Sequence, residues 1–334
     1  MLLKKVDRDL GIITTKIGNS YFNPTNANEQ KEKLFKDNTN NPKFTYLPQK
    51  DLTNIENKLL SLKANNSVYG QLLKKKIKEM HNLITMIKNV GKKEFTKYSL
   101  RIYGKPSSEL IKEARRILKI DEEEVWNKYS KLSMNKKFMD QFNINNYKWN
   151  VREKEMVAGA AISTKYNTLM INKGKDFSEN DVKRLIVHEI GTHVTRFENA
   201  KKQKYKMFRF GFPGYLETEE GLAAYNEYRC GLLSPKILRN YAGRVLANHM
   251  SLSSSFCSVY NDLLDYFPKN DAWTLTLRSK RGMIDTSKPG GFTKDHLYLK
   301  GFLKVKQFAE SGGDMKKLYV GKIGIEHVPL LDYI

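Results

Sequence analysis

Hydrophobic positions recur three and four residues apart in the first part of the chain, and this spacing predicts helices. It is found from Leu52 to Leu62 and again from Gln71 to Val90. A further helix is expected to open at Pro106-Ser107, where proline and serine supply start signals, and to continue to about Leu118. Lysines interrupt the apolar positions of the longest stretch, and we expect them to form a solvated outer face: Lys74, Lys75, Lys76 and Lys78.

The pattern changes in the middle of the chain. Between Lys148 and Asn172 the apolar residues alternate or come in short bursts, which predicts two or three strands. A helix is expected to follow from Ser178, because serine is a good N-cap and Asp181 stands three residues later in a capping-box position. That helix carries the sequence VHEIGTH, from Val187 to His193. We therefore expect an α+β fold that is mostly helical, with a small mixed or antiparallel sheet.

Length and composition fit an ordinary soluble chain. The 334 residues are 40% hydrophobic and 28% charged, and no run of eighteen apolar residues occurs. The first residues, MLLKKVDRDL, hold no apolar stretch long enough for a secretory signal, so we expect a cytoplasmic protein with no membrane partner. The two cysteines, Cys230 and Cys257, are expected to be buried reduced thiols.

The charge is strongly positive. Lysine and arginine number 59 against 36 acidic residues, which gives a net charge of +23. Such an excess attracts polyanions, of which nucleic acid, anionic membranes and acidic protein tails are the three kinds to consider. The sequence has no helix-turn-helix, zinc-knuckle or RNP-like aromatic pattern, so nucleic acid is not the favoured partner. A biased lysine and asparagine composition is the alternative explanation of the charge.

The stretch VHEIGTH places two histidines five residues apart, with Glu189 directly after the first. In the zinc motif HExxH the histidines are four residues apart and lie within about 40° of each other on one helix face. On an ideal helix His188 and His193 would differ by about 140°, too far for both to bind one ion. A single-turn π-bulge absorbs one residue, and Gly191 between the rings would ease that distortion. We predict such a bulge; two ordinary core or surface histidines are the alternative.

A third metal ligand is expected within YLETEEGLAAYNEY, from Tyr215 to Tyr228. Catalytic zinc takes three protein ligands and leaves one position to water, and two histidines with one glutamate are a known set. The piece EGLAAYNE resembles the second metal helix of gluzincin aminopeptidases, in which a glutamate before glycine supplies the third ligand. This resemblance makes Glu220 the ligand, with the adjacent Glu219, about 100° away around the helix, as its rival. It also implies that Glu227 supports the site without binding the metal.

A closer resemblance covers most of the chain. HEIGTH followed by EEGLA is similar to the microtubule-associated tyrosine carboxypeptidases and their bacterial relatives, which are sometimes described by a QEGLA motif. Further similar stretches are FNPTNANEQKEKLF, NPKFTY, INKGKDFS and RGMIDTSKPGGFTKDHLYLKG, so the resemblance runs from about residue 22 to about residue 330. It implies a zincin-like (gluzincin) fold whose edge strand binds peptide. The expected regions are an amino-terminal strap at 1–50, a helical subdomain at 51–147 and a catalytic region at 148–334, the last two forming one compact unit.

The same resemblance implies one zinc ion and removal of a carboxy-terminal tyrosine, or another aromatic residue, from a protein or peptide tail. Tubulin is the animal substrate, and the positive charge of this chain fits an acidic tail. Zinc on the two histidines and Glu220 would activate water, and Glu189 would take its proton and pass it to the leaving amine. Tyr298 is the first candidate donor to the oxyanion, with a packed core tyrosine as the alternative.

A carboxypeptidase must also bind the free α-carboxylate of its substrate, for which a planar guanidinium is well suited. Arg281 is the first candidate because Gly282 beside it indicates a tight loop, and a surface charge is the alternative for each candidate. Two rival functions are a zinc aminopeptidase, which needs acidic groups for the substrate amine, and a non-catalytic basic protein that binds nucleic acid. The other basic candidates for the carboxylate are Arg278, Lys280, Lys294 and Arg244.

Overall fold

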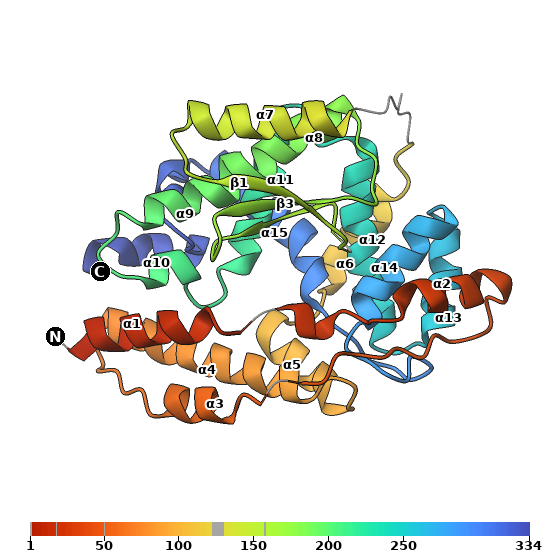
Figure 1. Cartoon of the computed structure of the whole chain (residues 1–334), viewed down its shortest axis with the longest axis horizontal. Helices are drawn as coiled ribbons and strands as arrows, with labels where there is room; N and C mark the ends of the chain where they lie inside the picture. The colour runs from red at the N-terminus through yellow and green to blue at the C-terminus, as the bar shows by residue number, and fades with distance from the viewer. Residues whose placement is uncertain (1, 18, 50, 122–129, 157) are drawn as a thin grey trace. The chain divides into compact units, whose positions relative to one another are not determined.

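Helices dominate the computed structural model of the chain, which describes residues 2–17, 19–49, 51–121, 130–156 and 158–334 (Figure 1). The strands found among these residues form one small sheet, so the expected α+β composition is confirmed. The chain divides into two compact units, here called unit 1 (Met1–Ile120 and Leu238–Leu299) and unit 2 (Asp121–Ile237 and Lys300–Ile334). Both units are discontinuous along the chain, whereas the regions expected from sequence were continuous. In the described part of the chain, no helix combines the length and the apolar character that a membrane crossing requires.

Unit 1 is built from amphipathic helices. The three predicted ones are found at α3 (Thr53–Leu60), α4 (Val68–Lys88) and α6 (Ser108–Ile117). The α4 lysines do not all face solvent as expected, since Lys76 is buried and its Nζ donates to Glu79 at 2.6 Å. The other elements are α1 (Leu2–Thr14), η1 (Asn19–Phe22), α2 (Ala27–Lys36), α5 (Glu94–Tyr103), most of α12 (Pro235–Ser251), α13 (Phe256–Leu264), α14 (Lys269–Lys280) and η3 (Lys294–His296).

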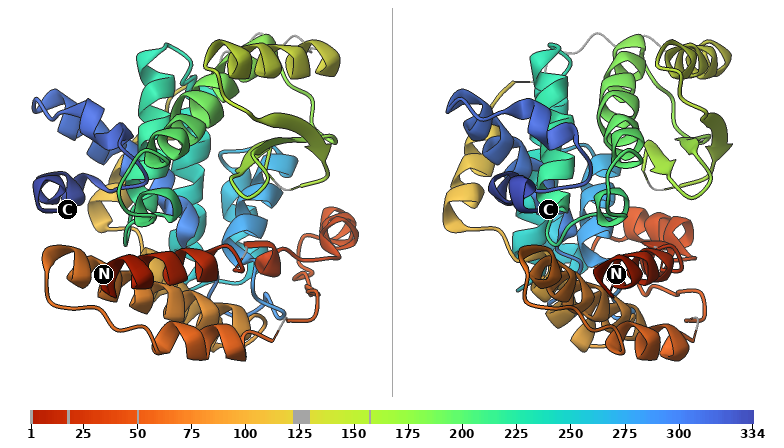
Figure 2. Two further views of the ribbon diagram at one scale, coloured as in Figure 1. Left: turned by 60° about the vertical axis from the view of Figure 1, so that its left-hand side comes forward. Right: turned by 90° about the vertical axis from the view of Figure 1, so that its left-hand side faces the viewer.

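Unit 2 contains the sheet, whose strand order is β1-β3-β2. β1 (Asn150–Lys154) runs parallel to β3 (Thr168–Asn172), and β2 (Ala160–Ser163) runs antiparallel to it, so the sheet is mixed and β2 is an edge strand. Leu169 and Ile171 of β3 lie two residues apart and therefore share one face, which packs on α7 (Lys131–Ile144) and on the helical run that follows the sheet. The strands and this helical run lie side by side in both views of Figure 2.

The helical run consists of α8 (Glu179–Leu185), η2 (Ile186–Val194) and α9 (Thr195–Ala200). It starts at the predicted capping box: the Ser178 hydroxyl accepts from the Asp181 N–H at 3.1 Å, and the Asp181 carboxylate accepts from the Ser178 N–H at 2.9 Å. Its middle part, η2, is a π-helix, so the predicted bulge is confirmed.

Gly191 is not needed for steric reasons in this π-helix. A Cβ at that position would lie 3.6 Å from the Ile186 carbonyl oxygen, which is an ordinary contact. The wide turn is instead marked by a threonine side chain that bonds five residues back: Thr192 Oγ1 donates to the Val187 carbonyl at 3.0 Å. The space around Gly191 therefore does not require glycine, and a side-chain hydrogen bond accompanies the wide turn.

Helix α11 (Leu216–Arg229) lies against η2 and approaches α15 (Leu297–Glu310) closely. A Cβ on Gly221 would lie 2.2 Å from the carbonyl carbon of Gly301, and one on Gly301 would lie 1.9 Å from the Glu217 oxygen. The glycine of the EEGLA stretch therefore sets the spacing of two backbones. α11 ends at Cys230, which is exposed; the expectation of two buried thiols holds only for Cys257. The remaining elements of unit 2 are α10 (Met207–Phe210), η4 (Met315–Tyr319) and η5 (Ile325–Tyr333).

Candidate metal centre

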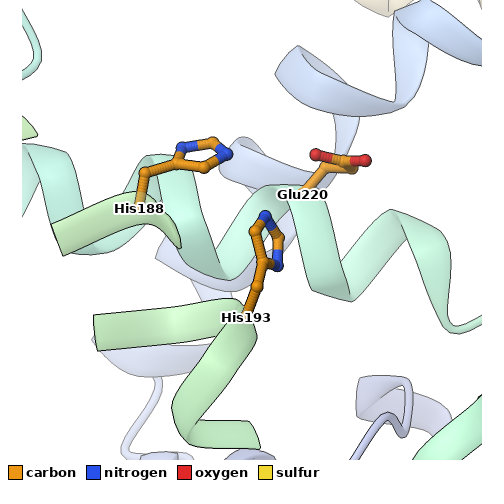
Figure 3. A group of neighbouring side chains, drawn as sticks. All are labelled: His188, His193 and Glu220. Carbon is orange, nitrogen blue, oxygen red and sulfur yellow. The ribbon is translucent and has the colours of Figure 1, made fainter. Parts of the chain in front are cut away.

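Two histidines from η2 and one glutamate from α11 point toward a common space (Figure 3). His188, His193 and Glu220 each offer one ligand atom, and these atoms lie within 4.8 Å of one another. The centroids of the two imidazole rings are 4.9 Å apart. All three side chains are buried. Thus the wide π-turn brings together two histidines that a regular helix would separate by about 140°.

The ring of His188 is held from behind by Glu227, on α11. The Nδ1 atom of His188 lies 2.7 Å from Glu227 Oε1, and Arg184 Nη1 donates to the same oxygen at 2.9 Å. Burial acts to raise the pKa of Glu227, but His188 and Arg184 outweigh it, so the pKa is lowered. The carboxylate is therefore ionised and fixes the orientation of the imidazole.

His193 has an equivalent support in Glu219. Its Nδ1 atom lies 2.8 Å from Glu219 Oε1, and the other oxygen of that carboxylate accepts from Nη1 of Arg196. Burial acts to raise the pKa of Glu219, but the charge of Arg196 and the bond to His193 bring it well below its usual range. For His193 itself, burial acts to lower the pKa, and the hydrogen bond and charge of Glu219 overcome this and raise it. Glu219, the alternative to Glu220 as third ligand, thus contacts Nδ1 of His193.

These residues fit a zinc ion. With each Nδ1 engaged by a carboxylate, Nε2 of each ring is left for a metal, as is usual for metal-binding histidines. Two imidazole nitrogens and one carboxylate oxygen form the set that catalytic zinc uses, which leaves a position for water.

Glu189 follows His188 directly and is also buried. Its charge, like that of Glu220, contributes to the raised pKa of His193, so this carboxylate lies close to the histidine pair. Glu189 is not one of the three residues whose ligand atoms converge, which are His188, His193 and Glu220.

The other predicted site residues belong to unit 1, where three arginines surround one buried carboxylate. Arg278 Nε donates to Asp295, and Arg281 Nη2 donates to it at 3.5 Å. Burial acts to raise the pKa of Asp295, but the arginine charges bring it well below the usual range. The guanidinium of Arg244 lies over the Tyr298 ring, 4.2 Å from its centroid.

Within unit 1, the structure thus brings Arg244, Arg278, Arg281 and Tyr298 into one cluster. Lys294 is half-buried in η3, near enough to lower the pKa of Tyr103 against the larger effect of burial. Lys280 is fully buried and donates to the backbone carbonyls of Ser251, Ser254 and Lys288, which commits it to holding loops.

Sequence reasoning missed both supporting arginines. Arg184 stands four residues before His188 and Arg196 three residues after His193, which are helical spacings that place each near its histidine. That spacing was the available signal. The pairing of each arginine with a carboxylate of α11 depends on how the two helices pack, which a motif does not reveal.

Comparison with known proteins identifies related sequences. The family model described as "Microtubule-associated tyrosine carboxypeptidase" matches residues 32–334. The chain is 31% identical over 167 residues to a mouse protein named putative tyrosine carboxypeptidase MATCAP2, which covers 46% of this chain and 30% of that protein. It is also 31% identical over 149 residues to the human microtubule-associated tyrosine carboxypeptidase 1, covering 43% of this chain and 31% of that protein. The matched stretch thus spans about a third of the length of these relatives.

Proposed function

The chain belongs to the microtubule-associated tyrosine carboxypeptidase family, and from that premise we propose that it is a zinc-dependent metallocarboxypeptidase. The proposed reaction is hydrolysis of the last peptide bond of a protein or peptide tail that ends in tyrosine or another aromatic residue. The observation that carries the proposal is the convergence of His188, His193 and Glu220 through a π-helix on one buried point.

The residues around that point have distinct proposed roles. Zinc held there would lower the pKa of a water molecule and polarise the scissile carbonyl. Glu189, buried beside the histidines, is the proposed general base that accepts the proton of the water and delivers it to the leaving amine. Glu219 and Glu227 hold the two rings in orientation. Tyr298 remains the proposed hydrogen-bond donor to the oxyanion.

Among the basic candidates, Arg244 is best suited to bind the substrate α-carboxylate. Among the residues that the structure describes, Arg244 Nη1 and Arg281 Nε are both buried without a hydrogen-bond partner. Arg278 and Arg281 already share the carboxylate of Asp295, whereas Arg244 Nε donates to the neutral amide of Asn240. A buried, unsatisfied guanidinium nitrogen favours an incoming anion. The ring of Tyr298 beneath Arg244 would orient the planar group.

The edge strand supports a zincin-like catalytic region. β2 is at the edge of the sheet and lies against η2, the helix that carries both histidines. The backbone groups of an edge strand can pair with an extended peptide and so guide its end toward the metal. The charge of +23 favours an acidic tail, similar to that of tubulin, as the proposed partner. The cytoplasm is the proposed place of action.

One experiment tests reaction and specificity together. Peptides that end in Tyr, Phe, Glu or Lys are incubated with the purified chain and analysed by mass spectrometry, each as the free acid and as the amide. The proposal expects loss of one residue from the free acids that end in Tyr or Phe, none from the amides, and no cleavage by Glu189→Gln.

A zinc determination on the same protein accompanies the assay. About one zinc per chain is expected for the wild type and for Glu189→Gln, and less for Glu220→Gln, because only the last removes a ligand. Cleavage that is equal on amides and free acids would contradict the carboxypeptidase, and a zinc-free active enzyme would contradict the metal mechanism.

A further inference from the structure

The segment Leu318–Ile323, here called the carboxy-terminal segment, contacts the metal helix at two points in unit 2. We propose that this segment holds the metal centre in its binding geometry. Arg196 and Tyr319 are the positioning residues through which it acts. The inference rests on the zinc site of the proposed function and adds to it a support that lies more than a hundred residues away in sequence.

The first contact is made by Arg196, whose side chain is fully buried. Its Nε donates to the carbonyls of Leu318 and Gly321 at 2.9 and 3.0 Å, and its Nη2 donates to the carbonyl of Ile323 at 2.6 Å. The remaining nitrogen, Nη1, binds Glu219, which holds His193. The three carbonyls therefore fix the guanidinium, the guanidinium fixes the carboxylate, and the carboxylate fixes the ligand.

The second contact is made by Tyr319 and supports the π-turn itself. Asn226 Nδ2 donates to the Tyr319 hydroxyl and to Thr192 Oγ1, both at 2.7 Å. Thr192 in turn donates to the Val187 carbonyl, the bond that marks the wide turn. Tyr319 is itself held in place because its carbonyl accepts from Asn199 Nδ2 at 3.0 Å. The segment thus reaches the residue before His193 as well as the ring of His193.

His188 provides an internal comparison. Its carboxylate, Glu227, is paired with Arg184, which belongs to α8 in the same helical run. These bonds connect residues of α8, η2 and α11. The contacts of the carboxy-terminal segment described above lead to His193 and to Thr192 beside it, so its effect is expected to be strongest on the His193 side of the site.

A matched control is available in unit 1. Arg239 also donates to three backbone carbonyls, those of Leu118, Ile120 and Tyr266. Its replacement removes the same kind of loop-holding contact without touching a residue of the zinc centre. Arg239→Lys therefore measures what an arginine of this kind contributes to stability alone.

The experiment compares Arg196→Lys, Tyr319→Phe and Arg239→Lys with the wild type. Zinc affinity is measured by competition with a chromophoric chelator, the absorption spectrum of the Co²⁺-substituted protein reports ligand geometry, and thermal unfolding reports stability. Arg196→Lys keeps the charge but cannot reach four acceptors, so its zinc affinity is expected to fall about 10- to 100-fold with an altered cobalt spectrum. Tyr319→Phe removes one hydrogen bond and is expected to weaken zinc about three- to tenfold.

Tyr319 borders a groove of about 330 Å³ that Gly191 and Asn226 also line. Water in this groove can partly replace the hydroxyl, so the loss of zinc affinity in Tyr319→Phe is expected to be smaller than in Arg196→Lys. Arg239→Lys is expected to lower Tm while zinc affinity and the cobalt spectrum stay at wild-type values. Wild-type affinity and spectrum in a folded Arg196→Lys would overturn the inference. Should that variant not fold, wild-type affinity in Tyr319→Phe overturns it instead.

The outcomes also separate this inference from the proposed function. A wild-type chain that binds zinc but cleaves no peptide contradicts only the proposed function, and the affinities of the variants then still decide the inference. A wild-type chain that binds no zinc overturns both.

Discussion

Replacing Gly221 by alanine is expected to damage both the fold and the metal site, because two backbones meet at this residue. The added Cβ would lie 2.2 Å from the carbonyl carbon and 2.3 Å from the carbonyl oxygen of Gly301. Carbon atoms in contact prefer a separation of about 3.5 Å or more, so α11 and α15 would have to move apart by about 1 Å. Neither clashing atom belongs to a side chain that could rotate away.

The size of the effect follows from that displacement. Forcing an extra methyl group into a packed interior costs about 1–3 kcal/mol. For a domain of 150–250 residues, each kcal/mol lowers Tm by roughly 2–4 °C, so a loss of about 2 kcal/mol corresponds to about 4–8 °C. Glu220 precedes Gly221, and a shift of about 1 Å exceeds the roughly 0.5 Å that a metal site tolerates. Zinc affinity should therefore fall together with Tm.

Gly191→Ala is the matched control, because it places the same methyl group in the other metal helix where there is room. The Cβ would be 3.6 Å from the nearest backbone oxygen. Since glycine is about 1 kcal/mol less favourable than alanine inside a helix, this variant should be as stable as the wild type or slightly more so. Thermal unfolding and chelator competition are measured on both variants. The reasoning is refuted if Gly221→Ala keeps wild-type Tm and zinc affinity, or if Gly191→Ala is equally damaging.

Three further outcomes are expected. Glu227→Gln should weaken zinc affinity about 10- to 100-fold in chelator competition, because it removes the negative charge that supports the ring of His188. The control Glu198→Gln, which alters a carboxylate bound to Trp149 in the same unit, should leave zinc affinity unchanged. Equal effects of the two variants would contradict the role of Glu227. Arg244→Ala should raise KM for free-acid peptides at least tenfold with a smaller change in kcat, and an unchanged KM would remove Arg244 from this role. Asp295→Asn should lower the free energy of unfolding near neutral pH. The pKa of Asp295 in the folded protein lies below its unfolded value of about 3.9, so the ion pair stabilises the protein above about pH 4. The difference in unfolding free energy between variant and wild type should therefore shrink as the pH falls below about 4. A difference that does not change with pH in urea titrations would contradict this.

Local signals in the sequence predicted the parts of the structure that local physics decides. The apolar spacing of α4 and the Ser178–Asp181 capping box each predicted a helix that the structure contains. On an ideal helix His188 and His193 would be about 140° apart, so a metal shared by both predicted the bulge that is found. The choice of Glu220 over Glu219 came from resemblance. In the structure Glu220 joins the two histidines and Glu219 faces the Nδ1 atom of His193.

The features that sequence reasoning missed depend on distant partners. The acceptors of Arg196 are backbone carbonyls, which any residue type provides, so no pattern near Leu318 announces them. Lys76 was expected to face solvent because other lysines stand beside it in the sequence. In the structure its place on α4 buries it, and its Nζ donates to Glu79.

The separation between Arg196 and its acceptors also has a consequence for biosynthesis. The carbonyls that Arg196 binds lie 122 to 127 residues further along the chain. At a synthesis rate of roughly 5–20 residues per second, they follow Arg196 out of the ribosome by about 6–25 s. During that interval Arg196 lacks these partners, so the support that it gives His193 through Glu219 is not yet complete. If the chain binds zinc as proposed, the His193 side of the site is therefore expected to reach its final geometry only after Ile323 has been made.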